Sequence, residues 1–343
     1  MPASDKLKAL LELANFYPSP HNGQPMVVRA SSSRRLEIGF DTSRGLSAVP
    51  ISYLFSFVTI GVFIRHLELC AAALGHRASV ELALPPAADM AGPAVLPCGV
   101  VKLEYDVVPP DATLEHRLRT RQTSRKRYDT GLNPQQVAQL HAIASGPGMK
   151  LVIAEPHQAA KVIWLNQRAV FDDMFNEPVR RELDHWLRYT HEQKEQTRDG
   201  LAYDCMELSG PVLKAIVKHY RLLRWPVVAS LLRQYYLRTM SDHSTVGYVV
   251  APFETEQQSY QIGRYVIDLW LHLTAQGAYL HPFGTVVANE QAHADFARLV
   301  GLSGETRANY VSFIFRAGFS DQPVRSDRIP YDHHLLTREG RHD

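Results

Sequence analysis

Apolar side chains recur with helical spacing at the start of the chain. The leucines of residues 1–16 fall every three or four positions between charged residues, which predicts an amphipathic helix. A second apolar segment, residues 49–64, has no charged residue. It is shorter than the roughly 20 residues that cross a bilayer, so it predicts the start of a buried core helix over about residues 52–74. We expect that helix to be buried at an interface, either between subunits or between two halves of the chain.

Strand-like patterns and a second set of helices follow this opening. Strands are predicted over residues 26–30, 36–40, 79–84, 100–107, 150–154, 245–251 and 309–316. Helical patterns cover residues 158–196 and 256–277, and a segment rich in proline, alanine and glycine, residues 85–99, predicts a loop. The mixture indicates an α+β fold.

The pair Pro109-Pro110 marks a plausible joint in the chain, since proline restricts the residue before it to extended conformations. We therefore expect one half over residues 1–110 and a larger half over residues 111–343. Within the larger half, residues 199–240 combine aromatic and basic side chains with two Pro interruptions, which favours a helical lid. Tyr203, Met206 and Trp225 are its candidate substrate contacts, although each aromatic taken alone is more often an ordinary core residue.

Composition narrows the function classes. The chain has 343 residues, 45% of them hydrophobic, and its 37 Lys and Arg against 35 Asp and Glu give a formal charge of +2. That balance argues against nucleic acid as a partner, and no membrane partner is expected. Three widely spaced cysteines suggest neither a disulfide framework nor a zinc site, and the N-terminal pattern is not that of a signal peptide. We expect a cytoplasmic protein without a metal centre.

The segment Pro18-Ser19-Pro20-His21-Asn22-Gly23-Gln24-Pro25 is the most informative one in the chain. Proline fixes φ and removes backbone donors, so this loop can hold its remaining polar groups in one geometry. Such a loop suits a planar polar ligand. A simple helix-ending turn would give the same composition.

A basic stretch, residues 117–128, has six cations and three Ser or Thr hydroxyl groups in twelve residues, and it should open a helix that ends near Gly131. The planar donor fork of arginine matches phosphate oxygens, and a Thr or Ser hydroxyl can complete the shell. The alternatives are a solvated basic helix start or a nucleic-acid patch. No other basic stripe accompanies this one, which favours a single bound phosphate.

These two segments resemble motifs of the nitroreductase-like family of FMN flavoproteins, in particular its duplicated branch. Residues 18–25 are similar to the family's P-S-x-x-N-x-Q-P loop, and Arg121, Thr123 and Arg125 are similar to its R-x-(S/T)-x-R phosphate motif. Further agreement comes from residues 180–200, 263–284 and 316–328. The resemblance implies a three-layer α/β/α sandwich in which two degenerate halves form a pseudo-dimer within one chain.

The resemblance also implies which residues hold the cofactor. Arg121 and Arg125, with Arg328 from the later tail, would bind the FMN phosphate. The polar loop would bind the edge of the flavin ring, and the segment 281–284 would approach its centre. The full set of expected cofactor residues is Pro18, Ser19, His21, Asn22, Gln24, Arg121, Thr123, Arg125, Pro282, Gly284 and Arg328.

The function implied is an FMN-dependent oxidoreductase that moves a hydride between the flavin and a small organic substrate, with NADPH or NADH as electron donor. A nitro compound, a quinone or a pathway-specific substrate would suit it. Two alternatives stay open: an FMN-sequestering protein whose lid seals the flavin, and an oxygenase that consumes its own flavin. The chain has no G-x-G-x-x-G, P-loop or G-x-S-x-G motif that would favour another chemistry.

Overall fold

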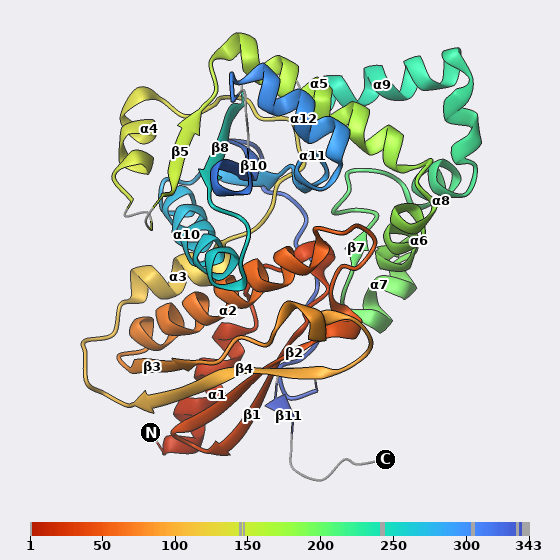
Figure 1. Ribbon diagram of the computed structural model, residues 1–343. Helices are drawn as coiled ribbons and strands as arrows, with labels where there is room; N and C mark the ends of the chain where they lie inside the picture. Colours follow the sequence, from red (N-terminus) through yellow and green to blue (C-terminus); the bar gives the residue numbers. More distant parts are fainter. Residues whose placement is uncertain are drawn as a thin grey trace.

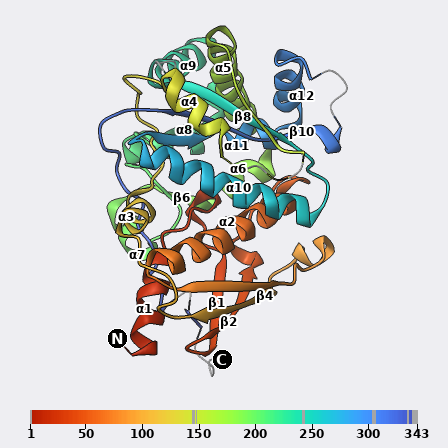
Figure 2. The same cartoon turned by 90° about the vertical axis from the view of Figure 1, so that its left-hand side faces the viewer.

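The computed structural model describes residues 2–143, 146, 148–240, 244–302, 306–333 and 336–337. Its architecture is α+β, as the sequence predicts. Two separate β-sheets enclose a pair of long helices, α2 (Ser52–Ala73) and α10 (Glu256–Ala275), so that the molecule is a stack of layers (Figures 1 and 2).

The first sheet has five strands in the order β11-β1-β2-β4-β3. They are β1 (Met26–Ser32), β2 (Arg35–Asp41), β3 (Arg77–Leu82), β4 (Val95–Glu104) and β11 (Leu336–Thr337). All neighbours are antiparallel except β11, which runs parallel to β1. One face packs on α1 (Ala3–Ala14) and α2, and side chains in β3 alternate between exposed and half-buried.

The second sheet has four antiparallel strands in the order β5-β8-β10-β9. They are β5 (Lys150–Ile153), β8 (Thr245–Ala251), β10 (Tyr310–Gly318) and β9 (Tyr279–Pro282). Side chains alternate along β8: Val249 and Ala251 pack with α10, whereas Val246, Tyr248 and Val250 pack on the opposite side. That opposite face is covered by α5 (Pro156–Asp173), α11 (Gly284–Ala288) and α12 (Glu290–Leu299), which gives three layers.

Helices α2 and α10 cross at two glycines. A Cβ atom on Gly61 would lie 2.0 Å from the carbonyl oxygen of Tyr260, and one on Gly263 would lie 2.0 Å from that of Val58. Both distances are impossible for a real side chain, so the two backbones approach this closely only because glycine occupies both positions. The prediction of a buried core helix is confirmed: α2 is long and apolar enough to span a membrane, yet 72% of its apolar window is buried in the protein.

The remaining elements surround this stack. The helices are α3 (Ala112–Thr120), α4 (Pro134–His141), α6 (Glu177–Trp186), α7 (His191–Thr197), α8 (Gly210–Lys218) and α9 (Pro226–Met240). Short 3-10 helices cover Pro20–Asn22, Thr42–Arg44, Ala87–Met90, Tyr220–Arg224 and Arg307–Asn309, named η1 to η5, and β6 (Leu187–Arg188) pairs with β7 (Leu201–Ala202). Helices α6 to α9 lie at one side of the molecule (Figure 1).

Several boundaries differ from the sequence prediction. The helix of the basic stretch ends at Thr120 and not near Gly131, because the chain turns at Arg121 into an extended path where Thr123 pairs with Leu280. Strand β4 begins inside the predicted loop 85–99. Its Pro97 is tolerated because the register with β2 shifts there. Residues 158–196 form three helices, since Pro156 and Pro178 each start a new one.

Candidate functional site

The polar loop after α1 has an unusual backbone. His21, Asn22 and Gln24 have φ values of 50°, 54° and 54°, which is the left-handed region that side chains other than glycine rarely occupy. Asparagine tolerates this conformation, but histidine and glutamine adopt it at a cost of roughly 1–2 kcal/mol each. Three such residues in four positions persist only where surrounding contacts impose them, and this kind of strain concentrates at functional sites.

The side chain of Gln24 supplies much of that constraint. It is fully buried, and its Nε2 donates to the backbone oxygens of Arg198 (2.9 Å) and Asn22 (3.3 Å). Its Oε1 accepts from the backbone N–H of Ile329 at 3.1 Å, and its own N–H donates to Ser19 Oγ at 2.9 Å. The amide therefore joins the loop to two distant segments. This places Gln24 in the framework of the site, where its amide bonds backbone groups.

A second support comes from Arg44, which lies in η2. Its Nε donates to the carbonyl oxygen of Gly23 at 2.7 Å, and its terminal nitrogen pairs with Asp199 at 2.6 Å. Asp199 also accepts from Arg188 at 2.6 Å, and the two arginines hold the pKa of this carboxyl below its usual range against the opposing effect of burial. The loop is thus fixed from both halves of the sequence.

Three arginines gather beside the loop, and we call Arg121, Arg325 and Arg328 the arginine cluster. Arg121 is buried, lies over the ring of Trp270 at 4.6 Å and donates to the carbonyl oxygen of Phe16 at 3.1 Å. The three guanidinium groups act on one another electrostatically. Among the described residues, no carboxylate forms an ion pair with any of them.

The cluster has unused donors. Arg121 Nε and Arg328 Nη1 are buried and have no hydrogen-bond partner in the described part of the chain. Burial and the neighbouring cations lower the pKa of Arg121, and burial lowers the pKa of Arg328 to about 10. Unpaired buried cations are costly, so this arrangement calls for an anion with several acceptor oxygens. A phosphate dianion has the matching charge and acceptors.

Asn22 connects the loop to the arginine cluster. Its Nδ2 donates to the backbone oxygen of Asp327, the residue before Arg328, at 3.1 Å. Its Oδ1 is buried and has no hydrogen-bond partner among the described residues, and the same holds for Nδ1 of the adjacent His21. A polar acceptor and a ring nitrogen are therefore available next to the cationic end of the site.

A second cationic group lies around Arg125, which acts electrostatically on both His21 and His281. Arg316 is fully buried, donates from Nε to His281 Nδ1 at 3.3 Å and lies over the ring of Tyr128 at 4.3 Å. Burial, with Arg125 adding to it, lowers the pKa of His21 to about 4, and the pKa of His281 is lowered for the same reasons with Arg316 contributing. Both imidazoles are neutral at pH 7.

The two groups divide the arginines that the sequence assigned to one phosphate. Arg328 lies with Arg121, as predicted from the tail. Arg125 instead donates to the backbone oxygen of Cys205 at 3.2 Å, and its charged neighbour is Arg316. The site is therefore elongated, with positive charge at both ends and the polar loop between them.

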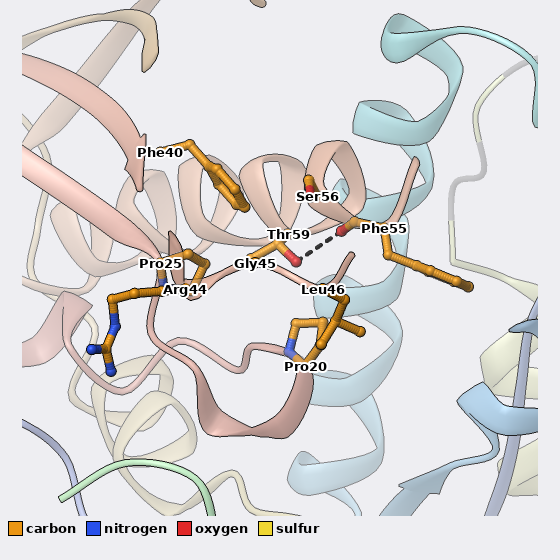
Figure 3. A pocket seen from close by; sticks show the side chains of 9 residues that line it. All are labelled: Pro20, Pro25, Phe40, Arg44, Gly45, Leu46, Phe55, Ser56 and Thr59. Carbon is orange, nitrogen blue, oxygen red and sulfur yellow. Dashed lines mark hydrogen bonds between the residues drawn. The ribbon is translucent and has the colours of Figure 1, made fainter. Parts of the chain in front are cut away.

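Two cavities border this arrangement. A small one of about 10 Å³, shown in Figure 3, lies between the loop and the start of α2 and has room for a water molecule at most. A larger one of about 330 Å³ lies beside Arg125 and reaches the lower end of the range for small-molecule sites. Its lining is Arg125, Lys126, Arg127, Asp129, Glu207, Tyr235, Thr239 and Asp321.

The other expected cofactor residues have the following positions. Pro18 and Ser19 lie in the loop, and Thr123 is half-buried beside β9. Pro282 ends β9 and Gly284 starts α11, where the sequence predicted a turn. Gly284 is exposed, and a Cβ atom there would meet no protein atom within 4 Å. The space next to it is open.

The three lid candidates separate into two environments. Tyr203 and Met206 pack with Leu187, Leu213 and other apolar residues of a small cluster under α8. Trp225 lies between η4 and α9 and is 63% exposed. From the predicted lid region, the large cavity is lined by Glu207, Tyr235 and Thr239. Tyr235 and Thr239 lie on α9, and periodicity alone does not tell which face of that helix turns inward.

Sequence reasoning also missed Arg325 and Arg316. Arg325 lies three positions before Arg328 in a tail segment without regular structure, and only the fold brings it beside Arg121. Arg316 sits in an apolar strand, where a lone charged residue was itself a signal of function. No group of three or more metal-ligating side chains occurs in the described residues.

No model of a known protein family matches the chain. A curated relative from Serratia sp., described as the probable NAD(P)H nitroreductase PigM, is 24% identical over 314 residues, covering 86% of this chain and 85% of the relative. This chain is therefore similar to a protein described as a nitroreductase. The similarity extends over most of the length of both proteins.

The solved structures similar to this chain are shorter than it. The FMN-dependent nitroreductase NfnB from Mycobacterium smegmatis, solved with NADPH, is 13% identical and covers 67% of this chain and 98% of its own, with a TM-score of 0.40. A nitroreductase-like family protein from Bacillus cereus is 13% identical and covers 66% of this chain and 95% of its own, with a TM-score of 0.34.

Proposed function

We propose that this chain is an FMN-dependent oxidoreductase that uses NADPH or NADH to convert a small organic substrate, such as a nitro compound or a quinone. The observation that carries the proposal is the arginine cluster, with its two unpaired buried nitrogens and no carboxylate partner among the described residues. The curated relative, described as a probable NAD(P)H nitroreductase, supports the same reaction class.

In this proposal the arginine cluster binds the FMN phosphate. Arg121 and Arg328 each have a nitrogen without a hydrogen-bond partner among the described residues, and the positive charge of Arg325 repels both guanidinium groups. A phosphate dianion would accept from these nitrogens and cancel the repulsion, and a hydrogen bond to a charged group is worth about 1.5–3 kcal/mol. The three-arginine arrangement therefore favours a phosphorylated flavin over riboflavin.

The polar loop and Arg125 would hold the flavin ring. Asn22 Oδ1 is an unpaired acceptor, which suits a ring N–H donor, and neutral His21 offers Nδ1. The guanidinium of Arg125, with Arg316 behind it, would favour negative charge on the ring after reduction. Bound FMN would supply the hydride transfer chemistry, and this chain would supply position, charge and exclusion of water.

We propose that the cavity beside Arg125 admits the substrate. Its volume of about 330 Å³ suits a small molecule, and its wall includes residues of the segment 199–240, which keeps a lid role for that segment. Tyr203 and Met206 would support the lid from beneath. The division into halves at about residue 110, the pseudo-dimer within one chain and the cytoplasmic location remain parts of this proposal.

An anaerobic absorbance titration tests the reaction class. The purified chain is saturated with FMN, and NADPH and then NADH are added without oxygen. Bleaching of the flavin band, followed by recovery on addition of a quinone, is the expected result. Bound FMN whose absorbance band is bleached neither by NADPH or NADH nor by dithionite would instead indicate a sequestering protein. Protein that binds no FMN would refute the proposal.

A further inference from the structure

Residues 210–240 form a structural unit, which we call the basic arm, made of α8, η4 and α9 at the outer edge of the molecule (Figure 1). From Leu208 to Met240 the sequence contains no Asp or Glu. It does contain six cations: Lys214, Lys218, Arg221, Arg224, Arg233 and Arg238. The rest of the chain then holds 31 Lys and Arg against 35 Asp and Glu, so the arm carries +6 and the remainder −4.

The basic arm also exposes large apolar side chains. Val227, Leu231 and Trp225 are 72%, 62% and 63% exposed, and Val212 and Leu222 are exposed as well. Val227 and Leu231 are one helical turn apart, so they share one face of α9. A cluster of exposed apolar residues of this kind marks an interaction surface.

The inner side of the basic arm is already in use. Leu213 and Val217 of α8 are buried in an apolar cluster, and Tyr220 of η4 packs against Phe175 with ring centroids 5.6 Å apart. In α9, Tyr236 and Leu237 pack toward the core around α5. These contacts fix the orientation of the arm, so its exposed apolar residues are on the side turned away from the protein.

We propose that the outer face of the basic arm docks on the surface of a bilayer that contains anionic phospholipid. Interfacial helices combine an apolar face that enters the acyl boundary with Lys and Arg that meet the lipid headgroups, and Trp is favoured at that depth. The arm has all three features. The −4 charge on the rest of the chain would turn the arm toward the negative surface.

Other occupants fit less well. A second copy of this chain in a symmetric dimer would bring the same patch against itself, and its cations would face one another; of the six, Lys218 is paired with Asp184 at 2.6 Å. Nucleic acid would satisfy the cations but would leave Val227, Leu231 and Trp225 against a polar backbone. A bilayer satisfies both parts of the surface. The arm is a second basic region beside residues 117–128, which the sequence prediction of a single basic stripe missed. The short apolar run of residues 49–64 bears on spanning a bilayer and not on docking at its surface.

Docking would also orient the large cavity. Tyr235 and Thr239, which line that cavity, belong to α9, the same helix that carries Val227 and Leu231. The cavity would therefore lie close to the headgroup region. A predicted lid over the site and a docking surface make different demands of Trp225, since a lid residue needs contact with the ligand and a docking residue needs contact with lipid.

Vesicle flotation of the FMN-loaded full chain tests the proposal. Phosphatidylcholine vesicles with one third phosphatidylglycerol should carry the protein at low salt, and pure phosphatidylcholine vesicles should carry much less. Arg233→Gln with Arg238→Gln should weaken binding by about fivefold for each charge removed, and added salt should do the same. Brominated lipid should quench a tryptophan signal that Trp225→Phe abolishes.

Two variants separate the apolar contribution from general effects. Val227→Ser with Leu231→Ser should reduce flotation while leaving FMN absorbance unchanged, since both side chains are exposed and remote from the arginine cluster. Val95→Ser is the matched control, because Val95 is 59% exposed on the first sheet. Equal flotation on neutral and anionic vesicles, or no response to the arm variants, would overturn the proposal. So would a dimer that Val227→Ser and Leu231→Ser dissociate.

Discussion

Replacing Arg328 with glutamine should stabilise the FMN-free protein and should weaken the binding of FMN. In the free protein, burial lowers the pKa of Arg328 to about 10 from an ordinary 12.5, so folding disfavours its charged form at neutral pH. One pKa unit is about 1.4 kcal/mol, which makes the ceiling for this cost about 3 kcal/mol. Because the side chain is only half-buried, we expect glutamine to stabilise the free protein by about 1–2 kcal/mol.

With FMN the same substitution removes a charge-assisted contact to the phosphate. The loss of about 1.5–3 kcal/mol corresponds to FMN binding weaker by roughly ten- to 150-fold. Flavin fluorescence quenching measures the dissociation constant, and thermal unfolding with and without FMN measures both effects in one protein. The FMN-free Arg328→Gln protein should melt at a higher temperature than the FMN-free native protein. The further rise in melting temperature that FMN causes should be smaller in the variant.

Riboflavin provides the internal control, since it has the ring without the phosphate. Its affinity should be the same in the native protein and in Arg328→Gln. Arg77→Gln is the control variant: Arg77 is an exposed arginine of β3 that pairs with Glu104 at 3.3 Å, and its replacement should leave FMN binding unchanged. An equal loss of riboflavin and FMN binding, or a free protein that Arg328→Gln destabilises, would refute the assignment of the phosphate to the arginine cluster.

Three further predictions concern the framework. Gly61→Ala should destabilise the fold by at least about 1–3 kcal/mol in chemical denaturation, because its methyl group would meet Tyr260 O; an unchanged midpoint would contradict the close helix crossing. Burial raises the pKa of Asp173 to about 6, so the folded state keeps this proton to a higher pH than the unfolded state, and the protein loses up to about 3 kcal/mol of stability as pH rises from about 4 to 6. Asp173→Asn should remove that loss. A variant that keeps the native pH profile would exclude this carboxyl as its cause. Gln24→Ala should cost about 2–4 kcal/mol and weaken FMN binding, because three backbone groups lose their partner; normal FMN affinity with normal proteolytic resistance of residues 319–333 would show that the amide is dispensable.

The sequence predicted the regular elements better than the site. Helices α2 and α10 and strands β8 and β10 were expected within a few residues, since long apolar or alternating runs leave little choice of structure. The boundary at Thr120 was missed because Arg121 leaves the helix for a tertiary pairing between Thr123 and Leu280. No local pattern encodes such a partner.

For the site, local motifs indicated the right segments but not the roles of single residues. Gln24 and Asn22 have the same amide chemistry, yet Gln24 bonds backbone groups and Asn22 keeps a free oxygen. Arg121 and Arg125 are four positions apart and belong to different groups. These differences depend on which distant segment folds against each residue, and a single sequence does not contain that information in readable form.

The cluster that would hold the phosphate is completed late in synthesis. The cluster joins Arg121 to Arg325 and Arg328, which come after every strand of the second sheet. The polar loop around Asn22 precedes these two arginines by about three hundred residues. A ribosome-bound chain could therefore form the second sheet, strands β1 to β4 of the first sheet and the α2–α10 pair before it gains affinity for the cofactor. Cofactor capture would then report that translation has passed residue 328, and a chain cut before that point would fold without becoming a flavoprotein.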